Sequence, residues 1–410
     1  MDKDDQICAR SITNVLIWFP FVNEFVSRCE EGEMAMRKAT VLLLAILVTI
    51  SCKRQNADVS RPTAGQSTTS QPARRFTEDE LKAFSSLEPV DTHTHVFRDD
   101  PSFQALLSRL HLHIVDILLV NDHDDYLKDL HPALDEVLTI VRANEGRVLL
   151  CTSFSPYKFN QPHFAEDAIR QLNENFQQGA IAVKIWKTLG MEVKNSKGQY
   201  VLPDDPALEP IYRDIADHNK TLIAHLAEPD SCWQPPNPAD VDYSYYQEHP
   251  EWYMYRHPGV PSKKQILEAR DHLLQMNPKL RVVGAHLGSM EDSLDDIAER
   301  FDRYPNFAVD TAARVPHLMI QPSEKVRAFV LRYQDRILYA TDLEFLPKAN
   351  PKEVEAEWED QYALDWRYFA TSDTFDYEGH RVQGLDLPQP VLRKLYHDNA
   401  VRWIPGVLSK

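Results

Sequence analysis

Eight short apolar runs that alternate with amphipathic segments constrain the fold of this 410-residue chain more than any other feature. The runs cover Pro89–Phe97, Ile114–Val120, Val148–Phe154, Ala180–Trp186, Thr221–Ala227, Leu280–Leu287, Asn306–Ala312 and Ile337–Asp342. Nearly continuous apolar runs are typical of parallel strands that are buried on both faces. Helical patterns lie between them, for example in 166–178, 208–219 and 264–276. Eight strand–helix units predict an α/β fold, a closed (β/α)8 TIM barrel that forms one domain over residues 76–410.

Two long insertions interrupt the regular spacing, one after the fifth strand and one after the eighth. The first, residues 229–279, begins with a stretch rich in aromatic residues and prolines. The second, residues 347–381, carries the aromatic residues Trp358, Tyr362, Trp366 and Tyr368. Connections that leave the carboxyl ends of barrel strands form the rim where active sites lie. We therefore expect both insertions on that rim, the first either as a lid or pocket wall or as a packed surface excursion without a ligand role.

Polar residues stand at the carboxyl ends of several predicted strands. His93 and His95 end the first strand, and residues two apart in an extended strand face the same side. His225 ends the fifth strand, His286 the sixth and Asp342 the eighth. A lone histidine in an apolar strand is usually a core residue, but chance does not explain five such residues at one end of one barrel. The pattern predicts a metal site at the mouth of the barrel.

The chemistry of these side chains indicates a divalent metal, with zinc as the first choice. Imidazole nitrogens and one carboxylate are the ligands expected for zinc or a similar ion that keeps one position open to water. Such an ion lowers the pKa of that water from about 16 towards about 7. We predict Asp342 as the catalytic group that takes the proton and passes it to the leaving group. His286 is predicted either as a ligand or as a catalytic residue that orients the water or polarises a carbonyl group.

These residues and their order resemble the amidohydrolase superfamily, in particular its amidohydrolase-related (amidohydrolase 2) branch. The resemblance extends over roughly 90–405 and runs through VDTHTHVF, AVKIWKTLG, LIAHLAEP, VVGAHLGS, YATD and LRKLYHDNAVRWIPG. The metal ligands that it implies are His93, His95, His225 and Asp342. It also implies that His286 assists the reaction or binds a second metal ion.

Three further positions leave alternatives open. Some members of the superfamily carry a carboxylated lysine that bridges two metal ions at the end of the fourth strand, and Lys184 occupies a comparable place. Alternatively, Lys184 pairs with an acidic neighbour and the site holds one ion. Arg314, after the seventh strand, either binds a substrate carboxylate or phosphate through its planar fork or lies on a helix surface. Glu228, just past His225, either supports the site or is solvated.

The first 75 residues differ from the barrel and predict an export signal. A basic segment, 36–38, precedes an unbroken apolar run of 12 residues, 39–50. A bilayer-spanning helix needs about 20 such residues, whereas a signal peptide has a core of this length. The run ends at Cys52 in a sequence that resembles a bacterial lipoprotein box, although a short buried helix with an incidental cysteine is the alternative. We predict a misplaced start plus a lipoprotein-type signal peptide over residues 1–52, with the true start at Met34 or Met36.

Composition adds a linker, a location and the partners. Residues 53–75 contain no aromatic residue and are rich in Ser, Thr, Gln, Pro and Ala, so we expect a disordered linker. The protein is then exported, on the periplasmic or cell-surface side, and touches the membrane only through a lipid at Cys52. Of the five cysteines, Cys151 and Cys232 remain in the barrel, and we expect Cys151 to be free and buried. A net charge of −17 argues against a nucleic-acid partner, which needs a basic face.

The sequence as a whole predicts a metal-dependent hydrolase that acts on a small molecule through a metal-activated water. A metal-dependent decarboxylase is the first alternative, because it uses the same ligand set. A non-catalytic surface lipoprotein that binds a ligand on the same barrel is the second. Specificity in barrels depends on the loops, and the two aromatic insertions favour a partly apolar or ring-bearing substrate.

Overall fold

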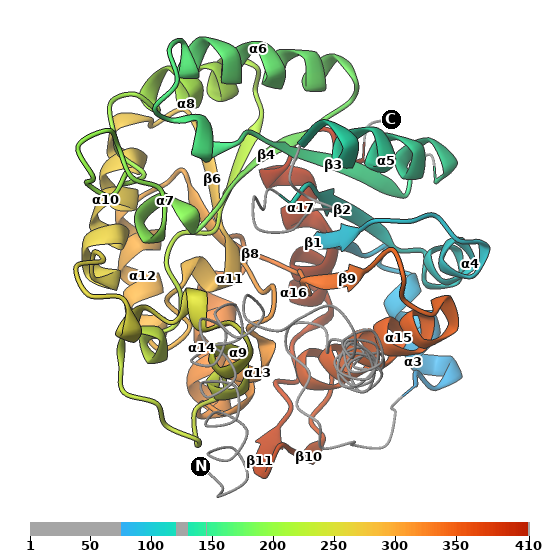
Figure 1. Cartoon of the computed structure of the whole chain (residues 1–410). Coiled ribbons are helices and arrows are strands. Elements are labelled where there is room, and N and C mark those ends of the chain that lie inside the picture. Colours follow the sequence, from blue (N-terminus) through green and yellow to red (C-terminus); the bar gives the residue numbers. More distant parts are fainter. Residues whose placement is uncertain (1–74, 120–129, 145, 409–410) are drawn as a thin grey trace, which may run out of the picture. The chain divides into compact units, whose positions relative to one another are not determined.

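Parallel strands form the centre of the structure, a computed structural model that describes residues 75–119, 130–144 and 146–408 (Figure 1). The strands are β1 (Val90–Val96), β2 (His113–Ile117), β3 (Val148–Ser153), β4 (Ala182–Ile185), β5 (Thr221–Ala224), β6 (Arg281–Gly284), β7 (Phe307–Asp310), β8 (Ile337–Leu338) and β9 (Leu343–Phe345). Each of the eight predicted runs contains one of the strands β1 to β8, except that β2 begins one residue before its run. The predicted start, signal peptide and Cys52 anchor, and the linker up to residue 74, lie outside the described residues and stay predictions.

The sheet closes into a barrel because its two edges belong to one stretch of chain. Its order is β8-β7-β6-β5-β4-β3-β2-β1-β9, and only residues 339–342 separate β8 from β9. The N–H of Thr92 donates to the carbonyl of Tyr339 at 3.1 Å, and the N–H of Asp342 donates to the carbonyl of His93 at 2.9 Å. These bonds join β1 to the chain between β8 and β9. The predicted (β/α)8 barrel is confirmed, with β9 as a short extension of the eighth strand.

Helices surround the barrel and bury one apolar face each against it (Figure 1). The main ones are α3 (Glu78–Ser85), α4 (Pro101–Leu110), α5 (Leu130–Ala143), α6 (Phe164–Gln177), α8 (Glu209–Asp217), α10 (Lys263–Met276), α12 (Leu294–Arg303) and α14 (Ser323–Arg332). Local sequence sets their starts: Ser262 and Gln265 form a reciprocal capping box at α10, as Thr77 and Glu80 do at α3. The three predicted helices agree with α6, α8 and α10 to within two residues at each end.

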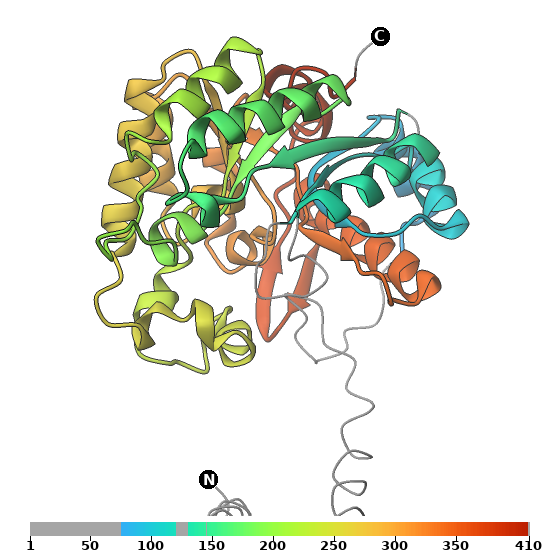
Figure 2. The ribbon, with the colours of Figure 1, turned by 45° about the horizontal axis from the view of Figure 1, so that its top comes forward.

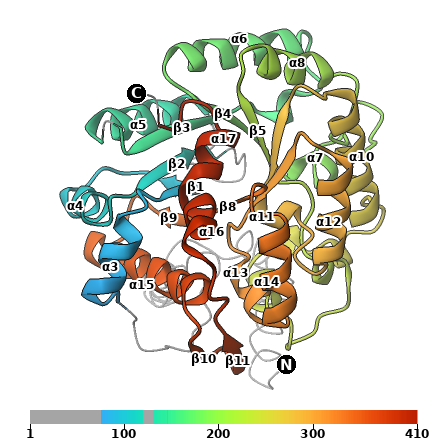
Figure 3. The ribbon, with the colours of Figure 1, turned by 180° about the vertical axis from the view of Figure 1, so that it is seen from behind.

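The C-terminal helical segment covers the amino ends of the strands (Figure 3). It consists of α16 (Gln389–Arg393), a π-helical turn, η5 (Lys394–Asp398), and α17 (Asn399–Trp403). The carbonyl of Trp403 accepts a hydrogen bond from the Thr221 hydroxyl, at the start of β5, at 2.5 Å. The indole of Trp403 donates to the carbonyl of Asp335, just before β8, at 2.9 Å. This end of the barrel is therefore closed, which leaves the carboxyl ends of the strands for a site.

Short turns, the first insertion and the hairpin of the second insertion lie at the carboxyl ends of the strands. The turns are η1 (Pro156–Lys158), α7 (Thr188–Met191), α11 (Ala285–Gly288) and α13 (Val315–Met319). The first insertion contains η2 (Asp230–Trp233), α9 (Tyr243–Glu248), η3 (Pro250–Trp252) and η4 (Met254–Arg256). The second contains α15 (Pro351–Ala370) and a hairpin of β10 (Thr374–Tyr377) and β11 (His380–Gln383). Figure 2 shows the yellow-green α9 region and the orange-red hairpin on the same side of the barrel.

The prediction that the second insertion lies on the rim is confirmed for its hairpin, which lines the cavity with Tyr377 and Glu378, but wrong for α15 and its aromatic residues. The four residues are at most 5% exposed, and they belong to the main hydrophobic core: Trp358, Tyr362, Trp366 and Tyr368. The physical reason is that α15 packs as an outer helix against α4, where the rings of Phe103 and Trp358 lie 4.9 Å apart. A paired ion contact between Arg109 and Glu359, with both N–O distances at 2.9 Å, holds the same two helices together.

Two cysteines lie in the described part of the chain. Cys151 in β3 is free and buried, as expected, and Cys232 in η2 is free and buried as well. None of the helices in the described part of the chain is both long and apolar enough to span a bilayer.

The burial of α15 leads to a prediction about stability. Trp358→Ala removes a fully buried indole from the contact between α15 and α4, so we expect it to lower the free energy of unfolding by about 3–5 kcal/mol. Tyr255→Ala, which removes a ring that is 52% exposed, is the control and should change it by less than about 0.5 kcal/mol. Urea unfolding measures both values. Equal losses in the two variants would contradict the packing of α15.

Candidate metal centre

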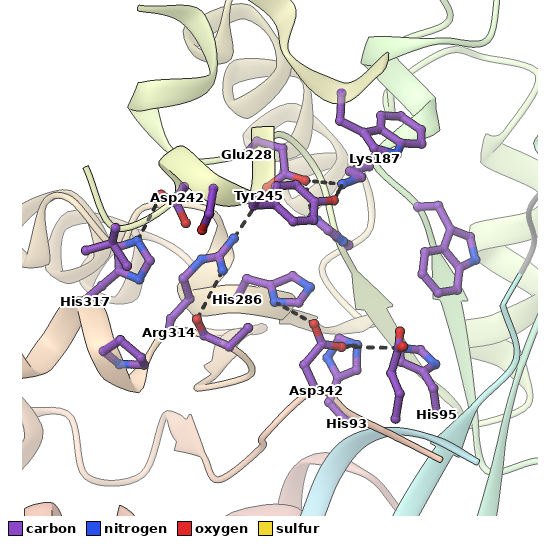
Figure 4. A pocket seen from close by; sticks show the side chains of 18 of the residues that line it. His93, His95, Lys187, Glu228, Asp242, Tyr245, His286, Arg314, His317 and Asp342 are labelled. Carbon is purple, nitrogen blue, oxygen red and sulfur yellow. Dashed lines mark hydrogen bonds and ion pairs between the residues drawn. The ribbon is translucent and has the colours of Figure 1, made fainter. Parts of the chain in front are cut away.

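Two histidines and an aspartate converge at the carboxyl end of the barrel (Figure 4). His93 and His95 come from β1, and Asp342 comes from the turn between β8 and β9. The Nε2 atoms of His93 and His95 lie 3.2 Å and 3.3 Å from Oδ1 of Asp342. Among the residues that the structure describes, these three form a group whose donor atoms all lie within 4.8 Å of one another. The structure thus brings together three of the predicted metal ligands.

The second nitrogen of each of these imidazoles is held by an acceptor. Nδ1 of His93 donates to Oδ2 of Asp310 at 3.2 Å, and Nδ1 of His95 donates to the carbonyl of Ile117 at 2.8 Å. With the proton on Nδ1, Nε2 of each imidazole can bind a metal ion. Two imidazole nitrogens and a carboxylate oxygen therefore lie within reach of one point. A divalent cation fits this donor set.

The imidazoles around Asp342 favour its ionised form. Burial raises the pKa of Asp342, but His93, His286 and His95 hold it well below the ordinary value of an aspartate. This direction agrees with a role as metal ligand or proton acceptor, which requires the carboxylate form.

Lys184, on β4, lies against the same group. Its Nζ is 2.8 Å from Nε2 of His93, and the side chain is fully buried. Burial lowers the pKa of Lys184 to about 8. The position agrees with the predicted end of the fourth strand, while the bridging and the non-bridging role of Lys184 both stay predictions.

His286 lies beside the group, as its place after β6 predicts. Its ring centroid is 4.9 Å from that of His93, and its Nδ1 is 4.0 Å from Oδ2 of Asp342. Nδ1 also donates to the carbonyl of Ala312 at 3.0 Å, which leaves the lone pair on Nε2. Burial lowers the pKa of His286 well below the ordinary value, so its ring is neutral.

His225 packs against His286, with 4.1 Å between the ring centroids, and lies outside the tight group. Its Nε2 is buried and has no hydrogen-bond partner among the described residues; Oε1 of Glu228 is 3.6 Å away. Burial lowers the pKa of His225 well below the ordinary value. A neutral, buried imidazole nitrogen without a partner is a suitable fourth ligand for an ion in this group.

The backbone that carries these side chains is strained at the ends of four strands. The φ angles are +69° at Ala227 after β5, +59° at His286 after β6, +52° at Ala313 after β7 and +68° at Asp342 after β8. A non-glycine residue in this left-handed region costs on the order of 1–3 kcal/mol and persists only where its surroundings impose it. Such strain is concentrated at functional sites, which agrees with the position of the metal centre.

Asp310, the last residue of β7, holds two of the histidines and was not among the predicted site residues. Its Oδ2 accepts from Nδ1 of His93, and its Oδ1 accepts from the N–H groups of His286 at 2.8 Å and Ala312 at 3.2 Å. The sequence contains a signal for it, because Asp310 ends the seventh strand as Asp342 ends the eighth. The hydrogen-bond partners of Asp310, however, cannot be predicted from the sequence, because they depend on the spatial arrangement of the strands.

The turn that carries His286 is tightly packed against the core of the barrel. A Cβ atom on Gly284 would lie 2.8 Å from Cα of Gly288 and 2.8 Å from the ring of Phe307, so only glycine fits there. The buried Arg270 donates from Nη1 to the carbonyl of Gly288 at 2.7 Å. The position of His286 is therefore fixed by the core as well as by Asp310.

Charged residues form the wall opposite the metal group (Figure 4). Nη2 of Arg314 is 3.4 Å from Oε2 of Glu228, and its Nε is 3.7 Å from Oε2 of Glu291. Nζ of Lys187 pairs with Oε1 of Glu228 and donates to the hydroxyl of Tyr245 at 2.9 Å. Arg314 is only 8% exposed, so the alternative that it lies on a helix surface is wrong. Glu228 is likewise buried and supports this wall.

A cavity of about 270 Å³ lies between the metal group and the charged wall. Its lining includes residues of the first insertion, Val241, Asp242, Ser244, Tyr245 and Trp252. The first insertion is therefore a pocket wall, the first of its two predicted alternatives. Nε2 of His317, on α13, lies 3.2 Å from Oδ2 of Asp242, and this pair ties the insertion to the barrel. The second insertion contributes only Tyr377 and Glu378 of the hairpin.

Comparison with known proteins supports this assignment of the barrel. Residues 90–405 match the family model described as amidohydrolase. The chain belongs to the amidohydrolase family. The match covers every residue of the candidate metal centre and confirms the resemblance found in the sequence motifs. A search of curated proteins found no match.

Solved structures with a similar fold come from enzymes with different reactions. A 2,6-dihydroxybenzoate decarboxylase from Rhizobium has 13% identity and a TM-score of 0.45, with 77% of this chain and 98% of that chain covered. A manganese complex of 5-carboxyvanillate decarboxylase from Novosphingobium aromaticivorans has 14% identity and a TM-score of 0.44, with 77% and 95% covered. A dihydroorotase from Campylobacter jejuni has 14% identity and a TM-score of 0.41, with 77% and 82% covered. These likenesses leave the reaction of this amidohydrolase open.

The hydrogen bonds of Asp310 lead to a prediction about metal affinity. Asp310→Asn replaces one acceptor oxygen by an amide that donates, so it cannot hold both His93 and the turn of His286. We expect Zn²⁺ to bind about 10- to 100-fold more weakly, as measured by competition with a chromophoric chelator. Asp302→Asn, on the exposed face of α12, is the matched control and should leave the affinity unchanged. An unchanged Kd in Asp310→Asn would contradict the role of Asp310.

Proposed function

We propose that this amidohydrolase is a metal-dependent hydrolase that acts on a small anionic molecule. The observation that carries the proposal is the convergence of His93, His95 and the ionised Asp342 at the open end of the barrel. The cavity beside them gives a substrate access to this group.

The metal would be held by His93, His95 and Asp342, with His225 as the fourth ligand, and this set favours zinc. Lys184, if carboxylated, would allow a second ion. When bound, the ion lowers the pKa of water to about 7 and polarises the bond to be cleaved.

The chain's own residues then move the proton and orient the reactants. Oδ1 of Asp342 faces the two imidazoles of β1, while Oδ2 faces His286 at 4.0 Å. We assign Asp342 as the base that takes a proton from the attacking water and passes it to the leaving group. His286 is neutral and presents the lone pair of Nε2, so it orients the water by accepting a hydrogen bond.

Arg314 supports an anionic substrate. Its guanidinium is buried in the wall of the cavity, and after burial, which is the main cause, its charge also lowers the pKa of His93, His225 and His286. A planar guanidinium binds a carboxylate or a phosphate through two parallel hydrogen bonds. The neighbouring Trp186 and Trp252 add flat apolar surfaces to the same cavity.

Decarboxylation is the second candidate, and the same arginine favours it. A decarboxylase must hold the substrate carboxylate near the metal, and Arg314 with Lys187 offers two cations in the wall of the cavity. The ligand set itself is compatible with either reaction.

The two candidates differ in the fate of water. We expect the zinc-loaded protein, given carboxylate-bearing amides, lactones and aryl acids in isotopically labelled water, to form products that contain the labelled oxygen and to release no carbon dioxide. A chelator or His93→Ala should abolish turnover, and added metal should restore only the wild type. His380→Ala, on the exposed hairpin strand β11, is the control. Release of carbon dioxide without incorporation of the label would replace the hydrolase by the decarboxylase.

The assignment of Arg314 has its own test. Arg314→Gln removes the charge but keeps a polar side chain, and we expect KM for an anionic substrate to rise about 10- to 100-fold. A neutral analogue of the same substrate should be much less affected. Arg213→Gln, on the exposed face of α8, serves as the control. An equal effect on the anionic and the neutral substrate would show that Arg314 does not bind the anion.

A further inference from the structure

A buried carboxylate links the two chain segments that carry the metal-binding residues. Asp91 stands two residues before His93 in β1 and is 0% exposed. Its Oδ1 accepts from the N–H of His93 at 3.1 Å and from the N–H of Thr341 at 3.1 Å. Thr341 directly precedes Asp342. One oxygen of Asp91 therefore fixes the backbone of both segments relative to each other.

The other oxygen of Asp91 reaches the second insertion. Its Oδ2 accepts from the hydroxyl of Thr341 at 2.5 Å and from the hydroxyl of Tyr362 at 2.9 Å. Tyr362 lies on α15 and is fully buried. A buried carboxylate loses much free energy when a donor is removed, so each of its four donors helps to fix its position.

We propose that Tyr362 is a positioning residue for the metal centre, which acts through Asp91 on His93 and Asp342. The inference rests on the proposed metal-dependent function. Without the hydroxyl of Tyr362, Oδ2 of Asp91 keeps only the Thr341 hydroxyl as a donor, and the carboxylate is free to turn about its side-chain bonds. The separation of His93 and Asp342, 3.2 Å between Nε2 and Oδ1, is then less firmly set. Partners behind metal ligands influence affinity in this way because ligand distances tolerate little change.

The second insertion then helps to position the metal centre although its helix α15 does not line the cavity. Among the described residues, α15 contributes no side chain to the lining of the cavity, yet it supplies a donor to the carboxylate behind the ligands. The same helix is held to the barrel at a second point, where the hydroxyl of Tyr339 donates to Oδ2 of Asp365 at 2.8 Å. That bond attaches α15 but does not involve Asp91.

Two neighbouring tyrosines provide matched controls. Tyr339→Phe breaks the second attachment of α15 and leaves the donors of Asp91 in place. Tyr396 is also fully buried, 4.4 Å from Tyr339 between ring centroids, and its hydroxyl has no hydrogen-bond partner within the described part of the chain. Tyr396→Phe thus makes the same chemical change in the same core without removing a hydrogen bond.

The test compares Tyr362→Phe with these two variants in the full-length protein. The Kd for Co²⁺ is measured by titration of the visible absorption of the bound ion, and Tm is measured on the metal-free protein. We expect Tyr362→Phe to weaken Co²⁺ binding about tenfold and to change the absorption spectrum. Tyr339→Phe should lower Tm without a change in Kd, and Tyr396→Phe should change neither.

The possible failures are distinguishable. If Tyr362→Phe binds Co²⁺ as tightly as Tyr396→Phe, the inference is wrong while the proposed metal centre stands. If the wild type binds no Co²⁺, both are wrong. Should Tyr362→Phe fail to fold, Thr341→Ser, which keeps the hydroxyl, and Thr341→Val, which removes both the other donor to Oδ2 of Asp91 and the acceptor of the Leu343 N–H, are compared in its place. Weaker Co²⁺ binding in Thr341→Val than in Thr341→Ser supports control through Asp91, and unchanged binding overturns it.

Discussion

The negative charge of Asp342 is the interaction on which the arrangement of the barrel mouth depends. Oδ1 of this carboxylate lies 3.2 Å and 3.3 Å from Nε2 of His93 and His95, and the imidazoles beside it lower its pKa. Lys184 adds positive charge from the barrel interior, with Nζ 2.8 Å from Nε2 of His93. The left-handed backbone at Asp342 adds strain. The surrounding fold must hold this strained residue in place, so the ligands are positioned by the fold as well as by their mutual attraction.

Three of the histidines are each held by an acceptor that belongs to another part of the barrel. His95 of β1 donates to a carbonyl of β2, His93 of β1 donates to Asp310 of β7, and His286 after β6 donates to a carbonyl after β7. The tautomers that expose Nε2 thus depend on contacts between strands, and for His93 on a contact between β1 and β7, which are not neighbours in the sheet. This explains why a metal site can be built from residues far apart in sequence: strand register fixes the ligands and their partners in one step.

The sequence was sufficient for the parts of this structure that depend on periodicity. Apolar runs located the eight strands, and because parallel strands end at one mouth, His93, His95, His225, His286 and Asp342 could be assigned to it. The partners of these residues could not be found in this way. Asp310, Asp91 and Glu228 act through contacts that only the register and the closure of the sheet create. The second insertion was assigned to the rim as a whole. Its aromatic residues give the same sequence pattern whether they pack outside the barrel, as those of α15 do, or over its mouth.

The charged wall of the cavity connects substrate binding with the metal. Glu228 pairs with both Lys187 and Arg314, so the two cations are partly neutralised before any ligand enters. Lys187 is further enclosed by the rings of Tyr245 and Trp252, at 5.2 Å and 4.5 Å. Arg314 is itself paired with Glu228 and Glu291, so the attraction for the proposed anionic substrate would need a bound metal ion as well as Arg314. An anion that bridges these two poles binds more tightly when the ion is present, and by thermodynamic linkage it strengthens the binding of the ion by the same factor.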